Sequence, residues 1–314
     1  MPSGQPIFNR TKDPMRNRYV FPALTAAAAL MLTGCVDNSA PAAADKPSAS
    51  MDAAVPKNEK IAALLPAKIK SAGVLNVGMA NNYPPNEFKD SDGAPAGWSV
   101  DLTKALGESL GLKVNFDIGT FDNILPSVKA GKDDMGMSSF TDTLEREKQV
   151  DFVNYYSAGI QWASPKGKTV DPNGACGLKV AVQATTYEDT HEVPAKSKAC
   201  TDAGKPAINV FKYDAQDQAT NALVVGQVDA MSADSPVTLY AISQTKEKLQ
   251  TAGDAFEVAP YGIPVNKDSE FTPVLQKALQ ALIDDGTYTR ILSKWGVESG
   301  GVKTTALNVA SSNG

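Results

Sequence analysis

The chain has 314 residues and is mildly acidic, with 30 Lys and Arg against 35 Asp and Glu and a formal net charge of −5. Residues 1–34 hold four of the basic residues and one of the acidic ones, which leaves the remainder at −8. This balance argues against nucleic acid as a partner, because phosphate binding needs a basic face.

An export signal opens the chain. Arg16 and Arg18 precede an apolar run over residues 19–32, which is too short for a convincing membrane span and typical of a secretory signal. The run ends in Leu-Thr-Gly-Cys35, which resembles a bacterial lipobox. We therefore expect a lipoprotein signal peptide over residues 1–34, cleavage before Cys35 and lipid on its thiol. An ordinary signal peptide with a chance cysteine is the alternative.

The segments before and after this signal differ in composition. Residues 1–14 are polar and fit no part of a signal, so Met15 is a candidate start. Residues 35–60 are rich in Ala, Pro, Ser, Asp and Lys and predict a flexible tether. About 240 residues remain after the tether, enough for two lobes of ordinary size.

The cysteines and the histidine limit the chemistry. With Cys35 taken by lipid, Cys176 and Cys200 are expected to form a disulfide in an oxidising compartment. His191 is the only histidine, and we expect it on the surface. A metal site and a Ser-His or Cys-His hydrolase are therefore disfavoured. The chain has no phosphate-binding loop of the ATPase type.

The hydrophobic pattern alternates between strand and helix along the chain. The first series predicts strands near residues 75–79, 112–118 and 135–137, with helices from Ser99 to the stop at Gly111 and over 124–131. The second predicts strands near 178–183, 208–210 and 228–231, a capping box at Thr185 and Glu188, and helices over 219–226 and from Ser235. Such alternation predicts an α/β protein with mainly parallel sheets and helices on both faces.

The stretch from Ser138 to Arg146 places four hydroxyl residues and an arginine where a strand gives way to a helix start. A guanidinium presents paired donors to a carboxylate, and hydroxyls beside it can satisfy the remaining lone pairs. This pattern suits holding a small carboxylate without reacting with it. The alternative is an exposed arginine in a first helical turn with capping hydroxyls.

Two further polar sites follow strand ends in the second series. Thr185 and Thr186 come after one strand, and Asp234 comes after another. Ligands of open α/β sheets lie at such ends. Arg146 supplies positive charge and Asp234 negative charge, which suits a zwitterion. Taken singly, a threonine pair or an aspartate at a strand end is more often only a cap or turn residue.

The chain resembles the extracytoplasmic solute-binding proteins of polar amino-acid ABC transporters (family 3 solute-binding proteins), over about Ser71–Val297. The resemblance rests on an ordered set of motifs: Gly-Val-Leu-Asn-Val-Gly at 73–78, Tyr-Pro-Pro at 83–85, Gly-Trp-Ser-Val-Asp-Leu at 97–102, Phe-Asp-Asn-Ile-Leu-Pro at 121–126, Lys-Ala-Gly-Lys at 129–132, Thr-Leu-Glu-Arg at 143–146, Val-Asp-Phe at 150–152, Gln-Ala-Thr-Thr at 183–186, Gly-Gln-Val-Asp-Ala at 226–230, Asp-Gly-Thr-Tyr at 285–288 and Lys-Trp-Gly at 294–296.

This resemblance implies a two-lobed periplasmic-binding-protein fold of type II with two hinge strands. The first lobe would comprise residues 70–163 and 260–297, and the second residues 164–259. The hinge would lie near Gln161–Ser164 and Val258–Tyr261. Residues 298–314 are polar and are expected to be a loose C-terminal tail.

The resemblance also implies a role for each site residue. Arg146 would bind the ligand α-carboxylate and Asp234 the α-ammonium. The other expected ligand contacts are hydroxyls and aromatic walls: Ser138, Ser139, Thr141, Thr185, Thr186, Tyr83 and Phe121. For the two aromatic residues, ordinary packing is the alternative.

Two departures from the family pattern concern the pocket. Asn86 stands where an aromatic residue is usual, and we expect it to add a polar group to the side-chain pocket. Ala184 stands where a glycine is usual, which is tolerable unless the backbone needs a positive φ. Residues 79–82 lack the acid that members specific for basic amino acids carry there, so a lysine or arginine site is disfavoured.

The function implied is capture of a small amino acid between two lobes and delivery to the permease of an ABC importer. The protein would be a monomer, need no cofactor, and be exported and lipid-anchored to a bacterial membrane, facing the periplasm or the exterior. Two rivals remain. One is a dehydratase on the same scaffold, which needs a placed acid and a second cation. The other is a sensory lipoprotein that passes the signal to a receptor.

Overall fold

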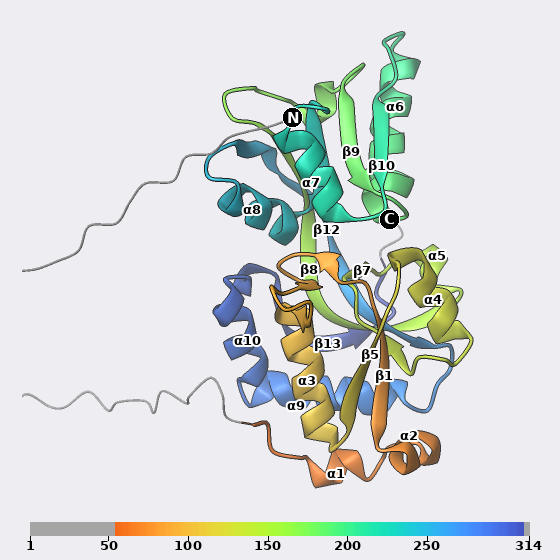
Figure 1. Cartoon of the computed structure of the whole chain (residues 1–314). Coiled ribbons are helices and arrows are strands. Elements are labelled where there is room, and N and C mark those ends of the chain that lie inside the picture. The colour runs from red at the N-terminus through yellow and green to blue at the C-terminus, as the bar shows by residue number, and fades with distance from the viewer. Residues whose placement is uncertain (1–53, 311–314) are drawn as a thin grey trace, which may run out of the picture. The chain divides into compact units, whose positions relative to one another are not determined.

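Two long antiparallel strands, β8 (Val150–Pro165) and β12 (Leu249–Asn266), pass through both lobes of this computed structural model (Figure 1). The structure describes residues 54–310. The expected signal peptide, Cys35 and most of the expected tether lie outside these residues. The long strands are central in the strand order β10-β9-β11-β8-β12-β6-β1-β5, with β13 on β8 and β7 on β12.

The first lobe holds the elements before β8 and after β12. They are α1 (Glu59–Ala62), α2 (Ala67–Ala72), β1 (Val74–Met79), β2 (Asn82–Tyr83), β3 (Glu87–Lys89), β4 (Pro95–Ala96), α3 (Trp98–Leu110), β5 (Lys113–Ile118), α4 (Phe121–Lys129), β6 (Met135–Gly136), β7 (Phe140–Thr141), α5 (Leu144–Glu147), α9 (Thr272–Asp284), α10 (Thr287–Trp295), the 3₁₀ turn η3 (Glu298–Gly300) and β13 (Gly301–Leu307).

Helices cover both faces of the first lobe's sheet. Leu75, Val77 and Met79 of β1 pack into the same core as α3, α9 and α10. On the other face, a Cβ at Gly78 or Gly136 would lie 3.2 or 2.9 Å from the Ile124 side chain of α4. These glycines therefore let α4 pack directly on the sheet. The strands β1, β5 and β6 pair in parallel, as predicted.

The second lobe holds the elements between the long strands. They are the 3₁₀ turn η1 (Pro172–Gly174), β9 (Lys179–Gln183), the π-helical turn η2 (Glu188–Glu192), α6 (Val193–Asp202), β10 (Asn209–Tyr213), α7 (Gln216–Val224), β11 (Ala230–Asp234) and α8 (Ser235–Gln244).

Its sheet is also covered on both faces. Val180 and Val182 of β9 face the core beneath α6, whereas Ala181 of the same strand faces α7 and α8. The strands β9, β10 and β11 pair in parallel. The predicted disulfide is present, joining Cys176 to Cys200 of α6 with a Cα–Cα distance of 5.5 Å. The two-lobed α/β fold is therefore confirmed.

The first crossing between the lobes lies earlier than the sequence suggested. Residues 160–163 of β8 already pair with β11 of the second lobe, so the expected hinge segment Gln161–Ser164 lies inside that lobe. Residues 153–156 still pair with β13 of the first lobe. The crossing therefore falls near Ser157–Gly159, opposite Phe256–Pro260 of β12, where the ladder shifts register. The second crossing overlaps the expected Val258–Tyr261.

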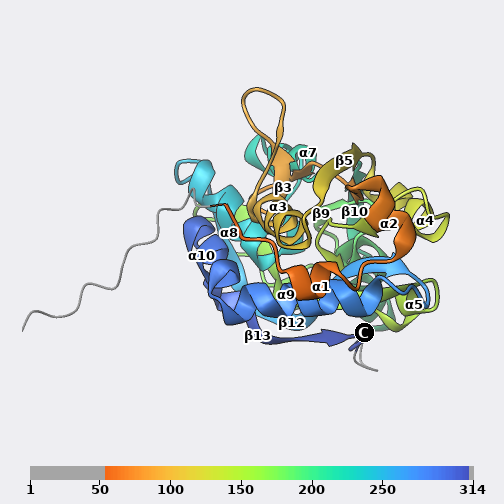
Figure 2. The ribbon, with the colours of Figure 1, turned by 90° about the horizontal axis from the view of Figure 1, so that it is seen from below.

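Both ends of the first lobe are more ordered than expected. The tether was expected to reach residue 60, but Asn58 caps α1 and Val55 N–H donates to Glu108 at 2.7 Å. The expectation of a loose tail is wrong for residues 301–307, which form β13 along α9 (Figure 2). One predicted helix start also moves: Ser99 lies inside α3, whose N-cap is Gly97.

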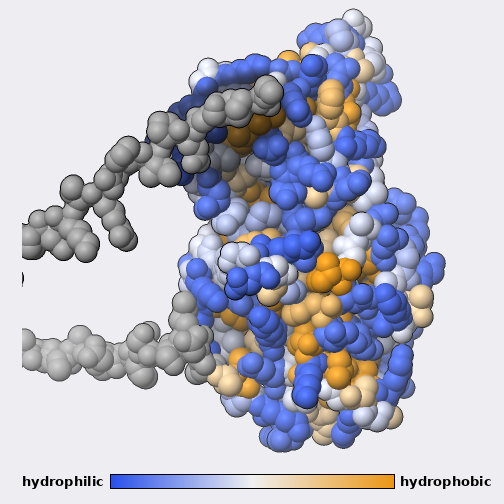
Figure 3. All heavy atoms as spheres, viewed as in Figure 1, coloured by the Kyte–Doolittle hydropathy of each residue, from blue (hydrophilic) through white to orange (hydrophobic). Residues whose placement is uncertain are grey.

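The surface exposes hydrophobic side chains at separate places. The face in Figure 3 is mostly hydrophilic, with hydrophobic patches on both lobes. Leu64, Leu144, Val225, Leu239 and Val258 are the most exposed large hydrophobic residues among those described. Within residues 54–310, no helix combines the length and apolar character that crossing a membrane requires.

Candidate functional site: a pocket between the lobes

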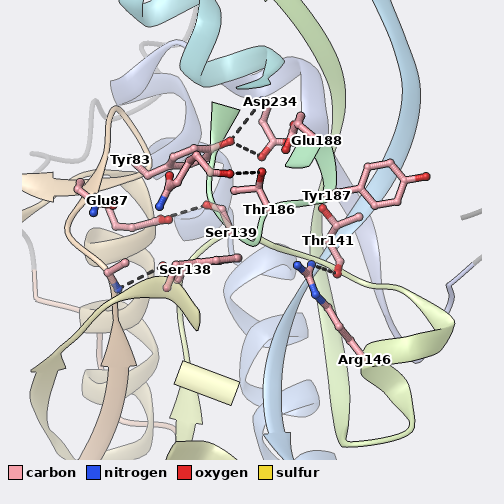
Figure 4. Close-up of a pocket in the computed structure, with 14 residues that line it drawn as sticks. Tyr83, Glu87, Ser138, Ser139, Thr141, Arg146, Thr186, Tyr187, Glu188 and Asp234 are labelled. Carbon is pink, nitrogen blue, oxygen red and sulfur yellow. Dashed lines mark hydrogen bonds between the residues drawn. The ribbon is translucent and has the colours of Figure 1, made fainter. Parts of the chain in front are cut away.

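A pocket lies where the two lobes meet, and its free volume of about 10 Å³ is no more than a single water molecule needs. Both lobes line it (Figure 4). The lining residues are Ala80, Asn82, Tyr83, Glu87, Phe121, Ser138, Ser139, Thr141, Arg146, Gln183, Thr186, Tyr187, Glu188 and Asp234. Of the nine predicted ligand residues, the structure brings eight to this pocket, and Thr185 is the exception.

Arg146 reaches the pocket from the short helix α5. The Thr143 side chain caps this helix by accepting from Arg146 N–H at 3.2 Å. The guanidinium donates to the Thr141 carbonyl at 2.8 Å and, across the lobes, to the Thr185 carbonyl at 3.3 Å. Its carbon lies 5.7 Å from the ring centre of Phe121, within cation–π range. Burial lowers the pKa of Arg146, and nearby carboxylates oppose that shift.

The two serines are held by hydrogen bonds on the first-lobe side. Ser138 Oγ accepts from Ala80 N–H at 3.2 Å. Ser139 Oγ accepts from the Asn86 amide at 2.9 Å and donates to Glu87 at 3.1 Å. Ser139 has a φ of +52°, which is uncommon for a residue with a Cβ and is typical of functional sites. The serines are therefore fixed in place before any ligand arrives.

Asn86 does not add a polar group to the pocket, contrary to expectation. Its amide oxygen accepts from the indole N–H of Trp98 at 2.7 Å, and its NH₂ donates to Ser139. Trp98 and Asn86 are both fully buried. The polar side chain is therefore used to satisfy a buried indole behind the pocket.

Tyr83 and Asp234 meet across the pocket from opposite lobes. The Tyr83 hydroxyl donates to the Asp234 carboxylate at 2.7 Å and accepts from Asp234 N–H at 3.2 Å. Burial raises the pKa of Asp234 to about 6, while the Tyr83 hydrogen bond and the charge of Arg146 lower it. Asp234 and Arg146 line the same pocket and form no ion pair with each other among the described residues.

The threonine pair divides its roles. Thr186 lines the pocket, whereas Thr185 lines a neighbouring cavity on the outer side of Arg146. The positive φ, +65°, belongs to Thr185 and not to Ala184. An alanine at position 184 therefore carries no backbone penalty.

The predicted capping box is displaced by one residue. Thr185 N–H donates to Asp189 at 2.9 Å, and Asp189 N–H donates weakly to Thr186 at 3.4 Å.

Sequence reasoning missed two acids that line the pocket. Glu87, from β3, lies opposite Arg146 in Figure 4 and is fully buried, and burial raises its pKa to about 8. Glu188, from η2, is also buried, and burial together with the charge of Asp234 raises its pKa well above the usual range. The only early signal was the capping pattern that named Glu188. Nothing in the local pattern around Glu87 pointed to a pocket.

The π-helical turn η2 gives its two end residues different surroundings. Glu188 faces the pocket, while Glu192 accepts from the Trp162 indole at 3.1 Å and from Ser232 Oγ at 3.0 Å in the second lobe. Turns of this kind are rare and are found mainly at functional sites.

The pocket wall carries unsatisfied acceptors. Asn82, Glu87, Gln183 and Glu188 each have a buried side-chain oxygen with no hydrogen-bond partner among the described residues. Buried polar groups are nearly always paired, and an unpaired one costs about 1–3 kcal/mol. Four acceptors around one pocket, two from each lobe, therefore call for a ligand that donates several hydrogen bonds.

Comparisons with known proteins agree with this geometry. Residues 75–298 match the model of the bacterial extracellular solute-binding proteins, family 3. The chain belongs to this family.

Among similar proteins is the arginine-binding protein ArgT of Corynebacterium glutamicum, 40% identical over 251 residues that cover 79% of this chain and 83% of that protein. The L-arginine-binding protein of Pseudomonas aeruginosa is 32% identical over 233 residues, covering 70% of this chain and 87% of that protein. The L-cystine-binding protein TcyJ of Escherichia coli is 28% identical over 236 residues, covering 73% and 84%.

Two solved structures share the fold. An ancestral arginine-binding protein bound to arginine is 36% identical with a TM-score of 0.65, covering 71% of this chain and 98% of that one. The ancestral amino acid-binding protein AncCDT-1, described as a precursor of cyclohexadienyl dehydratase, is 32% identical with a TM-score of 0.62, covering 73% and 97%. The second structure is thus described both as an amino acid-binding protein and as the precursor of an enzyme.

Proposed function

We propose that this chain binds a cationic amino acid, with L-arginine as its ligand, and delivers it to the permease of an ABC importer. The observation that carries the proposal is the pocket wall with its four unsatisfied acceptors, two from each lobe and two of them carboxyl groups. A guanidinium has five N–H donors and no acceptor, so it suits this wall better than the side chain of glutamine does. Two relatives named for arginine support the same choice.

This proposal reverses the expectation drawn from residues 79–82. That stretch contains no acid, but the acids of the pocket come from Glu87 and Glu188 instead. A bound cation would favour the ionised forms of both groups, which burial otherwise disfavours.

The remaining ligand groups would meet the residues named from the family pattern. The α-carboxylate would bind Arg146 and the hydroxyls near it, and the α-ammonium would bind Asp234. Phe121 would flank the aliphatic part of the ligand. Because these contacts come from both lobes, the ligand would favour the closed arrangement over an open one.

The test is calorimetry with L-arginine and L-citrulline, whose side chains have the same shape but differ in charge. We expect arginine to bind at least a hundredfold more tightly, because citrulline replaces a charged donor with a carbonyl acceptor. L-lysine and L-glutamine complete the panel. Equal binding of arginine and citrulline would refute the proposal.

We further propose that the chain is a lipoprotein monomer anchored through Cys35. The lipobox-like sequence supports this. Mass spectrometry of the mature N-terminus would detect diacylglycerol on Cys35, and Cys35→Ala would release the protein from the membrane. An unmodified N-terminus would refute lipid anchoring.

We propose that the chain has no enzymatic activity of its own. Arg146 is the only arginine or lysine that lines the pocket among the described residues, whereas a dehydratase substrate with an extra carboxylate needs a second cation. Turnover of prephenate or arogenate by the purified protein would overturn this assignment.

A further inference from the structure

The last described residues approach the loop that carries Arg146. After β13, Asn308 exchanges hydrogen bonds with the backbone of Phe152: its N–H donates at 3.1 Å, and its side-chain oxygen accepts at 2.7 Å. Its amide also donates to Asp151 at 3.0 Å. Asn308 has a φ of +48°, which turns the chain away from the β13 ladder. Residues 308–310 are called the C-terminal clasp below.

The clasp then binds two carboxylates, one just before α5 and one on the last residue of α5. Val309 N–H donates to Asp142 at 2.9 Å, and Ala310 N–H donates to Glu147 at 3.0 Å. Asp142 is buried and also accepts from Asn154 at 2.8 Å. One carboxylate thus lies two residues before α5, and the other lies next to Arg146 at the end of this helix.

The helix α5 depends on such contacts more than other helices do. It has four residues, and none of them is fully buried, so little hydrophobic packing fixes it. Isolated helices of this length are unstable. Hydrogen bonds from N–H groups to carboxylates are stronger than neutral ones. The clasp therefore holds α5 by hydrogen bonds where the hydrophobic core contributes little packing.

We propose that the C-terminal clasp is a positioning element of the ligand site, which holds α5 so that Arg146 meets the ligand α-carboxylate. This inference rests on the proposed role of Arg146. It assigns a function to a segment whose sequence predicted only a loose tail. The group that touches the ligand is Arg146, and the clasp acts through it.

The supporting electrostatics concern Asp142. Burial and the neighbouring Glu147 together raise its pKa to about 7. The Val309 N–H opposes these effects. Removing the clasp would therefore leave two neighbouring acids with fewer donors, and α5 would move to relieve them.

The experiment compares two truncated chains with the full chain. One ends at Leu307 and lacks the clasp; the other ends at Ala310 and keeps it. Each is tested with L-arginine and with agmatine, which lacks the α-carboxylate. We expect the chain ending at Leu307 to bind arginine about tenfold more weakly while its affinity for agmatine is unchanged. The chain ending at Ala310 should match the full chain for both ligands.

A ligand-independent measurement separates this inference from the proposed function. Hydrogen exchange of residues 143–149 in the ligand-free protein should speed up at least tenfold in the chain ending at Leu307, and stay unchanged in the chain ending at Ala310. If the full chain binds no arginine, the proposed function fails, and the exchange rates still decide whether the clasp holds α5.

A point variant covers the case in which the shorter chain fails to fold. Asn308→Gly keeps the positive φ but removes the side-chain bonds to Asp151 and Phe152, and we expect it to give the same pattern with a smaller effect. Unchanged exchange at residues 143–149 and unchanged arginine binding in the folded clasp variants would overturn the inference. Equal loss of arginine and agmatine binding would also overturn it, because a general loosening of the lobe would then be the cause.

Discussion

The two ends of the pocket differ in whether their polar groups already have hydrogen-bond partners. At one end, Arg146 already donates to the Thr141 and Thr185 carbonyls. At the opposite side in Figure 4, Glu87 carries an oxygen without a partner among the described residues. The first end is arranged in advance for a carboxylate, as any α-amino acid requires. The second end is left incomplete, so a cationic side chain would be selected there. The residues that bind the groups common to all α-amino acids and the residues that select the side chain thus lie at different ends of the pocket.

The largest expected effect is at the Arg146 end. Arg146→Ala should weaken L-arginine binding at least a hundredfold, because removing one partner of a desolvated charge pair costs about 2–5 kcal/mol. Calorimetry measures the affinity, and thermal unfolding checks that the fold is intact. Arg290→Ala, at an exposed arginine of α10, is the matched control. Affinity within threefold of the original would break the assignment of this end.

The next effect is at the acidic end. Glu87→Gln should weaken arginine binding about thirtyfold, because a hydrogen bond to a charged group is worth roughly 1.5–3 kcal/mol. Binding of L-glutamine should change by less than threefold, since the α-groups are untouched. Glu270→Gln, at an exposed acid, is the control. If both ligands weaken equally in competition binding, the two ends are not separate in function.

A smaller effect concerns pH. The pKa of Glu87 is raised to about 8 in the ligand-free structure, so at pH 7 this group is mostly protonated. A guanidinium favours the carboxylate, so binding releases a proton, and affinity rises with pH until the group is ionised without ligand. We expect about a tenfold gain per pH unit below pH 8 and a plateau above it.

Calorimetry in buffers of different ionisation enthalpy measures this proton release directly. The slope of affinity against pH should be smaller in Glu87→Gln. An affinity for arginine that falls as pH rises from 6.5 to 7.5 would contradict the electrostatic picture of the acidic end.

The smallest effect concerns Thr185. Its side chain lies outside the pocket, but its φ of +65° strains a β-branched residue. Thr185→Gly should therefore raise the melting temperature by about 2 °C, from roughly 1 kcal/mol of relieved strain. Arginine affinity should stay within threefold, because the Thr185 carbonyl still accepts from Arg146. Thr185→Ala, which relieves no strain, is the control; a tenfold loss of affinity in both would restore Thr185 as a ligand contact.

The Arg146 end could be predicted from the sequence because its parts are close together in the chain. Ser138, Ser139, Thr141 and Arg146 fall within nine residues, where local spacing decides which side chains converge. The alternation of strands and helices was equally readable, because helix and strand periods are local properties.

The acidic end could not be predicted in this way. Glu87 and Glu188 are about a hundred residues apart in sequence and line the same pocket only because the two lobes face each other. The position of the first hinge strand was also missed. Strand register depends on the partner strand, and β11 pairs with residues 160–163, which the family resemblance had assigned to the first lobe.

The π-helical turn η2 has hydrogen bonds that span one residue more than those of an α-helix, and this has a consequence for the second lobe. In η2, Glu188 serves the pocket while Glu192 is held by Trp162 and Ser232. Deleting one residue, such as Thr190, would convert the turn to an ordinary α-helix and rotate everything after it by about 100°. Glu192 would then leave its partners, and no side-chain exchange nearby could bring it back. Insertions and deletions at this turn should therefore be tolerated far less than substitutions.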